Sequence, residues 1–132
     1  MKLWVGYGSE HSSNLVMIGH FKDVDGAKEA KETIDRLMEQ VKSEDQSGKI
    51  KVGEHNEHFS DSMLALLRQV KIFSMGPSEL EQFVYDVAVK VENNDVVITT
   101  DEIEVSAFLK ILIDRGARLE IYSAHDYPRD EK

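Results

Sequence analysis

The runs DVVITT at residues 95–100 and RLEIYS at residues 118–123 decide the fold, because both are typical of strands and they flank a densely apolar segment. Asp101 stands where the N-cap of a helix is expected, and Gly116 follows the last apolar position. The segment Glu102–Arg115 is therefore predicted to be helical. The order strand, helix, strand predicts a β-α-β unit, and such units are right-handed in nearly all sheets.

This unit also indicates where a ligand would bind, because ligands of open α/β sheets lie outside the carboxyl ends of the strands. An aspartate can orient a histidine as a general base, but Asp101 already has a role as helix cap, so binding is favoured over catalysis. Asp101 and Glu102 would repel an anion, so we expect a cation or a neutral polar ligand. With the loop around His11 as a lid, the candidate binding residues are Thr100, Asp101, Ser123, His125 and Asp126.

The rest of the chain alternates strand-like and helix-like segments, with no linker that would separate domains. The sequence predicts strands at Leu3–Gly8, Leu15–Phe21 and Lys49–Val52, and helices from Asp23 or Asp25 to about Lys42, over Met63–Val70 and over Leu80–Val91. The order β-β-α-β-α-α-β-α-β predicts one α/β domain over residues 1–132, with α+β as the alternative class. We expect a mixed sheet of four to five strands with helices packed on its faces. Two β-α-β halves would also suit a ferredoxin-like arrangement.

The segment Leu15–Phe21 is expected to pair with Leu3–Gly8 as a hairpin and to lie centrally in the sheet. Its two faces are both mostly apolar, which is typical of a covered strand. His20 shares one face with Val16 and Ile18, so it is interpreted as a hydrogen-bonded core histidine rather than a metal ligand.

Composition excludes several classes of protein. The 132 residues carry 25 acidic and 16 basic side chains, a formal net charge of −9, which disfavours binding to the phosphates of nucleic acid. No run approaches the roughly 20 apolar residues that a membrane helix needs. The chain has no cysteine and its beginning does not resemble a secretory signal, so a cytoplasmic location is expected.

The segment Glu54-His55-Asn56-Glu57-His58 is the best candidate for a metal site. His55, His58 and Glu57 have the side chains that divalent transition metals prefer. Their spacing differs from the helical H-E-x-x-H pattern of zinc proteases, and a solvated polar loop is the favoured interpretation.

No pattern in the sequence names a reaction or indicates a particular cofactor. The leading hypothesis is a small soluble binding or regulatory domain that acts through protein–protein contacts, without catalytic activity. Because the helices Glu102–Arg115, Met63–Val70 and Leu80–Val91 carry more apolar surface than one small sheet can cover, the expected partner is a second copy in a C₂ homodimer. Another protein or a small-molecule ligand remains open as a partner. The alternative function is a hydrolase of small molecules, or one dependent on divalent metal, that uses the histidine-rich loops.

Overall fold

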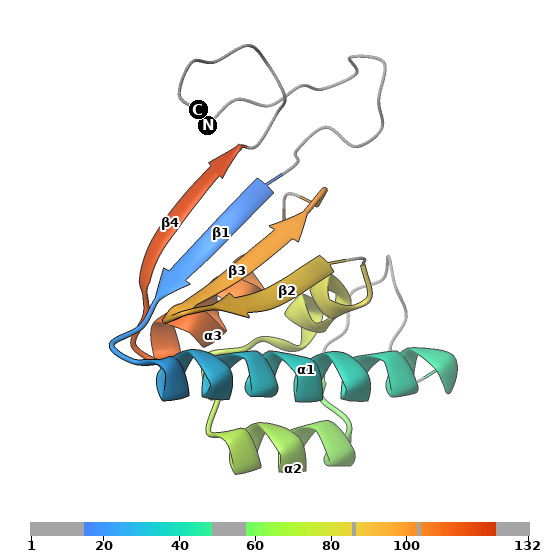
Figure 1. Cartoon of the computed structure of the whole chain (residues 1–132). Coiled ribbons are helices and arrows are strands. Elements are labelled where there is room, and N and C mark those ends of the chain that lie inside the picture. Colours follow the sequence, from blue (N-terminus) through green and yellow to red (C-terminus); the bar gives the residue numbers. More distant parts are fainter. Residues whose placement is uncertain (1–14, 49–57, 86, 103, 124–132) are drawn as a thin grey trace, which may run out of the picture.

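The computed structural model describes residues 15–48, 58–85, 87–102 and 104–123, which form one sheet with helices packed against it (Figure 1). In chain order the elements are β1 (Leu15–His20), α1 (Val24–Gln46), α2 (Asp61–Val70), the 3-10 helix η1 (Pro77–Phe83), β2 (Val87–Glu92), β3 (Asp95–Thr100), α3 (Ser106–Asp114) and β4 (Arg118–Ser123). The strands expected at Leu3–Gly8 and Lys49–Val52 lie outside the described residues. No described helix is long and apolar enough to cross a membrane.

The four described strands lie in the order β2-β3-β1-β4, and every neighbouring pair is antiparallel. β1 is central, as expected, and pairs with β3 along one edge and with β4 along the other over all six of its residues. β3 and β4 therefore run parallel to each other with β1 between them. Among the described strands the expected mixed sheet is not found, because β1 lies between the two parallel strands. Neither edge of β1 is free for the expected hairpin with Leu3–Gly8.

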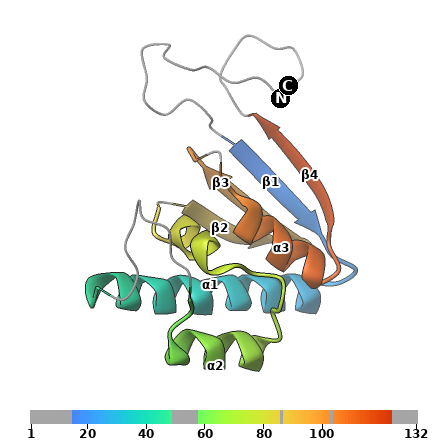
Figure 2. The ribbon, with the colours of Figure 1, turned by 180° about the vertical axis from the view of Figure 1, so that it is seen from behind.

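The described helices cover one face of the sheet only, although helices were expected on its faces. α1 contacts β2 and β3, α3 contacts β4, and η1 packs between α1 and α3, while α2 lies on the outer side of α1 (Figures 1 and 2). Gly19 of β1 allows α3 to approach closely, since a Cβ atom there would lie 3.2 Å from the side chain of Leu112. We call this side of the sheet the helix face.

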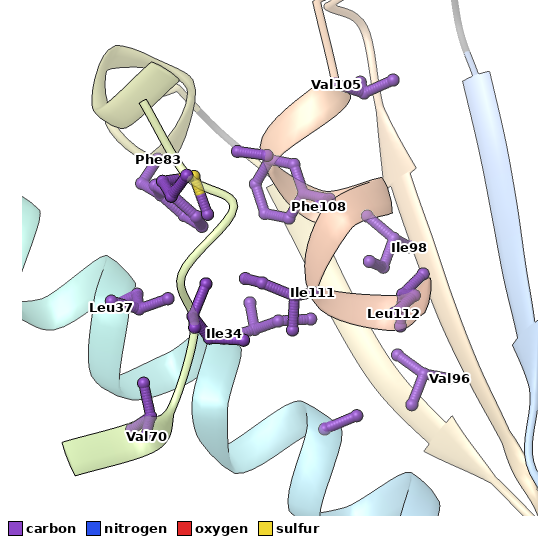
Figure 3. Close-up of a cluster of buried hydrophobic side chains, with 14 of the residues drawn as sticks. Ile34, Leu37, Val70, Phe83, Val96, Ile98, Val105, Phe108, Ile111 and Leu112 are labelled. Carbon is purple, nitrogen blue, oxygen red and sulfur yellow. The ribbon is translucent and has the colours of Figure 1, made fainter. Parts of the chain in front are cut away.

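The hydrophobic core lies between the helix face and the helices (Figure 3). Phe83 of η1 and Phe108 of α3 are both buried, and their ring centroids are 4.9 Å apart in a tilted arrangement. Ile111 and Leu112 of α3 are also fully buried. Much of the apolar surface of α3 is therefore covered within a single chain, although Ile113 is 59% exposed.

α1 forms where an apolar stripe at helical spacing meets a strong N-cap. The side chain of Asp23 accepts a hydrogen bond from Gly26 N–H at 2.8 Å. The buried stripe consists of Ala27, Ala30, Ile34, Leu37 and Val41. The helix extends four residues beyond the expected end near Lys42, because the buried Glu44 accepts hydrogen bonds from Gln40 and from Ser60, the N-cap of α2.

The prediction of a helix over Leu80–Val91 is wrong. Only its first part is helical, as η1, and its second part is β2. Val87, Val89 and Val91 fit both a helical stripe and an alternating strand pattern, and pairing with β3 decides between the two. Asn93 takes a positive φ of 56° in the two-residue turn between β2 and β3.

α3 begins at Ser106, later than expected, and Asp101 is not its N-cap. The side-chain oxygen of Gln82, in η1, accepts a hydrogen bond from Ala107 N–H at 2.8 Å. Closer to β3, Thr100 Oγ1 accepts one from Glu102 N–H at 3.0 Å. A backbone N–H group at the start of α3 is thus hydrogen-bonded by a residue from another element. Local sequence patterns do not reveal such a partner.

Candidate functional site

The structure places two of the expected binding residues at one edge of the sheet. Leu15 pairs with Thr100 on one side and with Ser123 on the other, so the carboxyl ends of β3 and β4 meet there. Thr100 is only 5% exposed, Ser123 is half-buried and Asp101, next along the chain, is exposed. His11, His125 and Asp126 lie outside the described residues. A ligand site at this edge therefore stays a prediction.

The histidine-rich loop is described only at His58, which is exposed. His55 and Glu57, the other two candidate metal ligands, lie outside the described residues. Within the described ranges, no three histidine or carboxylate side chains are grouped so that they could hold a metal ion.

Two shallow hollows of about 400 Å³ each lie along α1 and α2, on either side of a 2.7 Å hydrogen bond from Arg36 to Gln69. Arg115 lines one of them, and its guanidinium donates to the backbone oxygen of Val70 and lies 3.5 Å from Thr33 Oγ1. The side chain thereby links the ends of α2 and α3 to α1. These contacts make it a structural residue.

A second polar cluster, around Glu79, holds η1 against α3. The carboxylate accepts hydrogen bonds from Gly76 N–H at 2.8 Å, from Ser106 at 2.6 Å and from Lys110 at 2.7 Å. Burial alone would raise the pKa of Glu79, but these hydrogen bonds hold the pKa below its ordinary value. Because every partner is supplied by the chain itself, the cluster stabilises the packing of two elements.

The remaining candidate is the side of the sheet opposite the helices, which we call the open face. It is turned toward the viewer in Figure 1, and all described helices lie behind or below it. Side chains alternate along a strand, and paired residues share a face. The open face therefore carries Val16, Ile18 and His20 from β1, Ala88, Lys90 and Glu92 from β2, Asp95, Val97 and Thr99 from β3, and Arg118, Glu120 and Tyr122 from β4.

His20 lies between two carboxylates on the open face. Its Nδ1 lies 2.8 Å from Asp95 Oδ1, and its Nε2 lies 3.1 Å from Glu120 Oε2. The Nδ1 contact is a hydrogen bond, whereas Nε2 is close to Glu120 without hydrogen-bond geometry. A neutral imidazole carries a proton on only one nitrogen, so the other would place a lone pair close to a carboxylate. Asp95 and then Glu120 accordingly raise the pKa of His20 above its ordinary value of 6.5. The site thus favours an imidazolium that bridges β3, β1 and β4.

The open face is balanced in charge, although the chain as a whole is strongly acidic. With His20 protonated it has three basic and three acidic side chains, whereas the formal net charge of the chain is −9. Its apolar residues form a strip beside these charges. Ile18 and Val97 are half-buried at its centre, and Tyr122 is 44% exposed at its edge.

Sequence reasoning missed this site because its members are far apart along the chain. His20 was interpreted as a hydrogen-bonded core histidine on the face of Val16 and Ile18. The structure confirms the face and the hydrogen bond, but the core position is wrong, because the side chain is 36% exposed on the open face. Asp95 lies 75 residues further along the chain, and local patterns cannot detect such a pair. The available signal was the alternation of charged and apolar residues in 87–92 and 118–123.

Comparison with known proteins identifies a family. A family profile described as "Family of unknown function (DUF6375)" matches residues 1–132. No curated protein and no solved structure matches the chain.

Proposed function

The chain belongs to this DUF6375 family, and we propose that it is a small binding domain that makes protein–protein contacts through the open face of its sheet. The observation that carries the proposal is the composition of that face. Half-buried and exposed apolar residues lie beside a balanced set of charges, and no described helix covers them. Such a surface suits a protein partner, which can bury the apolar strip and pair the charges.

We also propose that the fold is ferredoxin-like. The order β1-α1-β2-β3-α3-β4 with the sheet order β2-β3-β1-β4 supports this, with α2 and η1 as an insertion between α1 and β2. In Figure 2, α3 lies in front of the sheet while the chain passes from β3 on the left to β4 on the right, in agreement with a right-handed crossover. In this arrangement both helices of the repeat lie on one face, and the other face is left for contacts.

A photoreactive phenylalanine analogue at Tyr122 tests the proposed function. The replacement keeps an aromatic ring on the open face, and the full chain should form a covalent adduct with one defined protein, identified by mass spectrometry, in cells that make it. The matched control carries the same analogue at Ile113, which is 59% exposed on α3 and away from the open face. Absence of an adduct at position 122, or the same adducts at both positions, would reject the proposal.

The alternative hydrolase function can be tested on the same purified protein. Metal analysis and a melting scan with divalent ions should detect a metal if the loop containing His58 binds one. A stoichiometric metal that is lost in His58→Ala would favour the hydrolase over the binding domain.

A further inference from the structure

The charges of the open face have opposite signs at mirrored positions of the sheet. Across one end, paired residues read Glu92 on β2, Asp95 on β3, His20 on β1 and Arg118 on β4, which is two acids followed by two bases when His20 is protonated. In the next open-face row, Lys90 on β2 lies at one edge and Glu120 on β4 at the other. Each acid therefore has a base at the same distance on the other side of the line between β3 and β1.

This pattern has a geometric consequence for two copies that meet open face to open face. A two-fold axis parallel to the strands, between β3 and β1, would set β2 of one copy against β4 of the other and β3 against β1. Glu92 would then meet Arg118 of the second copy, and Lys90 would meet Glu120 of the second copy. Asp95 would likewise meet His20. Every charged position of the open face would face the opposite charge.

The apolar residues follow the same symmetry. Val97 on β3 would face Ile18 on β1 of the second copy. Both residues lie in the middle of the row that has Lys90 at one end and Glu120 at the other. In the last row, Ala88 would face Tyr122, and Thr99 would face Val16. Aligned packing of two sheets is a common way to bury such faces.

We propose that the occupant of the open face is a second copy of this chain, packed about this two-fold axis; the inference rests on the proposed function of that face. The overall charge of −9 makes most of the surface repel a second copy, while the open face is balanced. The contact is small, because four strands of six residues span about 20 Å in each direction. A dimer that dissociates at micromolar concentration is therefore expected.

Charge reversal tests the geometry, because each substitution occurs twice in a symmetric dimer. Arg118→Glu and Glu92→Arg should each raise the dissociation constant about tenfold, since each places like charges opposite one another. The double variant, Glu92→Arg with Arg118→Glu, restores opposite charges at both contacts and should return to within about threefold of the original value. Sedimentation equilibrium measures all four dissociation constants.

Lys28→Glu is the matched control, because Lys28 is exposed on α1 and the change in charge equals that of Arg118→Glu. It should leave the dimer unchanged, and circular dichroism should show that every variant folds. A dimer that the double variant weakens further would overturn the proposed axis but not the use of the open face. A chain that stays monomeric at several hundred micromolar would overturn the second copy as occupant. An adduct of position 122 with another protein would still support the proposed function.

Discussion

The two faces of the sheet are built from the same four strands, yet they differ in how far their side chains are buried. On the helix face, Met17, Val96 and Ile98 are fully buried under α1 and α3, and burial within one chain is complete. On the open face, Ile18 and Val97 are only half-buried. His20 pairs there with Asp95 and Glu120, and Lys90 pairs with Glu92, at the surface. The comparison teaches that a central strand with apolar residues on both faces needs packing partners on both sides of the sheet. The described helices supply such partners on one side only.

The largest difference between the faces should appear in stability. Phe108→Ala removes a ring that is 1% exposed against the helix face, and the cavity should lower the free energy of unfolding by about 3–5 kcal/mol. Ile18→Ala on the open face should cost about 1 kcal/mol or less at concentrations where the chain is monomeric, because less of its surface is buried. Denaturant unfolding measures both values. Equal losses would break the comparison and would mean that the open face is as well covered as the helix face.

A smaller effect is expected where η1 caps α3 on the helix face. Gln82→Ala removes the acceptor for Ala107 N–H and the donor to Ser106, so it should lower the free energy of unfolding by about 1–2 kcal/mol. Gln69→Ala is the matched control, since its hydrogen bond to Arg36 is exposed and should contribute less than about 0.5 kcal/mol. Thermal or denaturant unfolding that gave the same loss for both variants would show that Gln82 does not act as the cap.

The smallest effect concerns the open face and its dependence on pH. The folded chain holds the proton of His20 more tightly than the unfolded chain, because Asp95 and Glu120 raise its pKa. The contribution of this bridge to stability is therefore complete below pH 6.5 and is lost as the pH rises through the raised pKa. NMR titration of the His20 ring should give that pKa directly.

The variant Asp95→Asn with Glu120→Gln provides the control for this titration. Both carboxylates become neutral amides of similar shape, so the pKa of His20 should return toward 6.5. A pKa of 6.5 or below in the unaltered chain would show that the imidazolium bridge does not form in solution.

Much of the described fold could be predicted because local patterns and tertiary packing agree there. β1, β3, β4, α1 and α2 follow their periodicity, and the shared edge of Thr100 and Ser123 follows from the strand order around α3. β2 could not be predicted, because its valines suit a helical stripe as well as a strand. The start of α3 and the bridge around His20 both depend on partners that lie far away in the sequence, Gln82 in one case and Asp95 with Glu120 in the other.

The central position of β1 has a consequence for folding while the ribosome synthesises the chain. β1 leaves the ribosome before the other described strands, yet its neighbours β3 and β4 are the last two, and the partner of His20, Asp95, lies 75 positions further along the chain. At about 5–20 residues per second, that wait lasts roughly 4–15 seconds. Of the described elements, α1, α2 and η1 can form from local contacts during this time, before β3 is synthesised. Among the described strands, the apolar β1 therefore waits longest for its partners, which makes it the expected binding segment for a chaperone during synthesis.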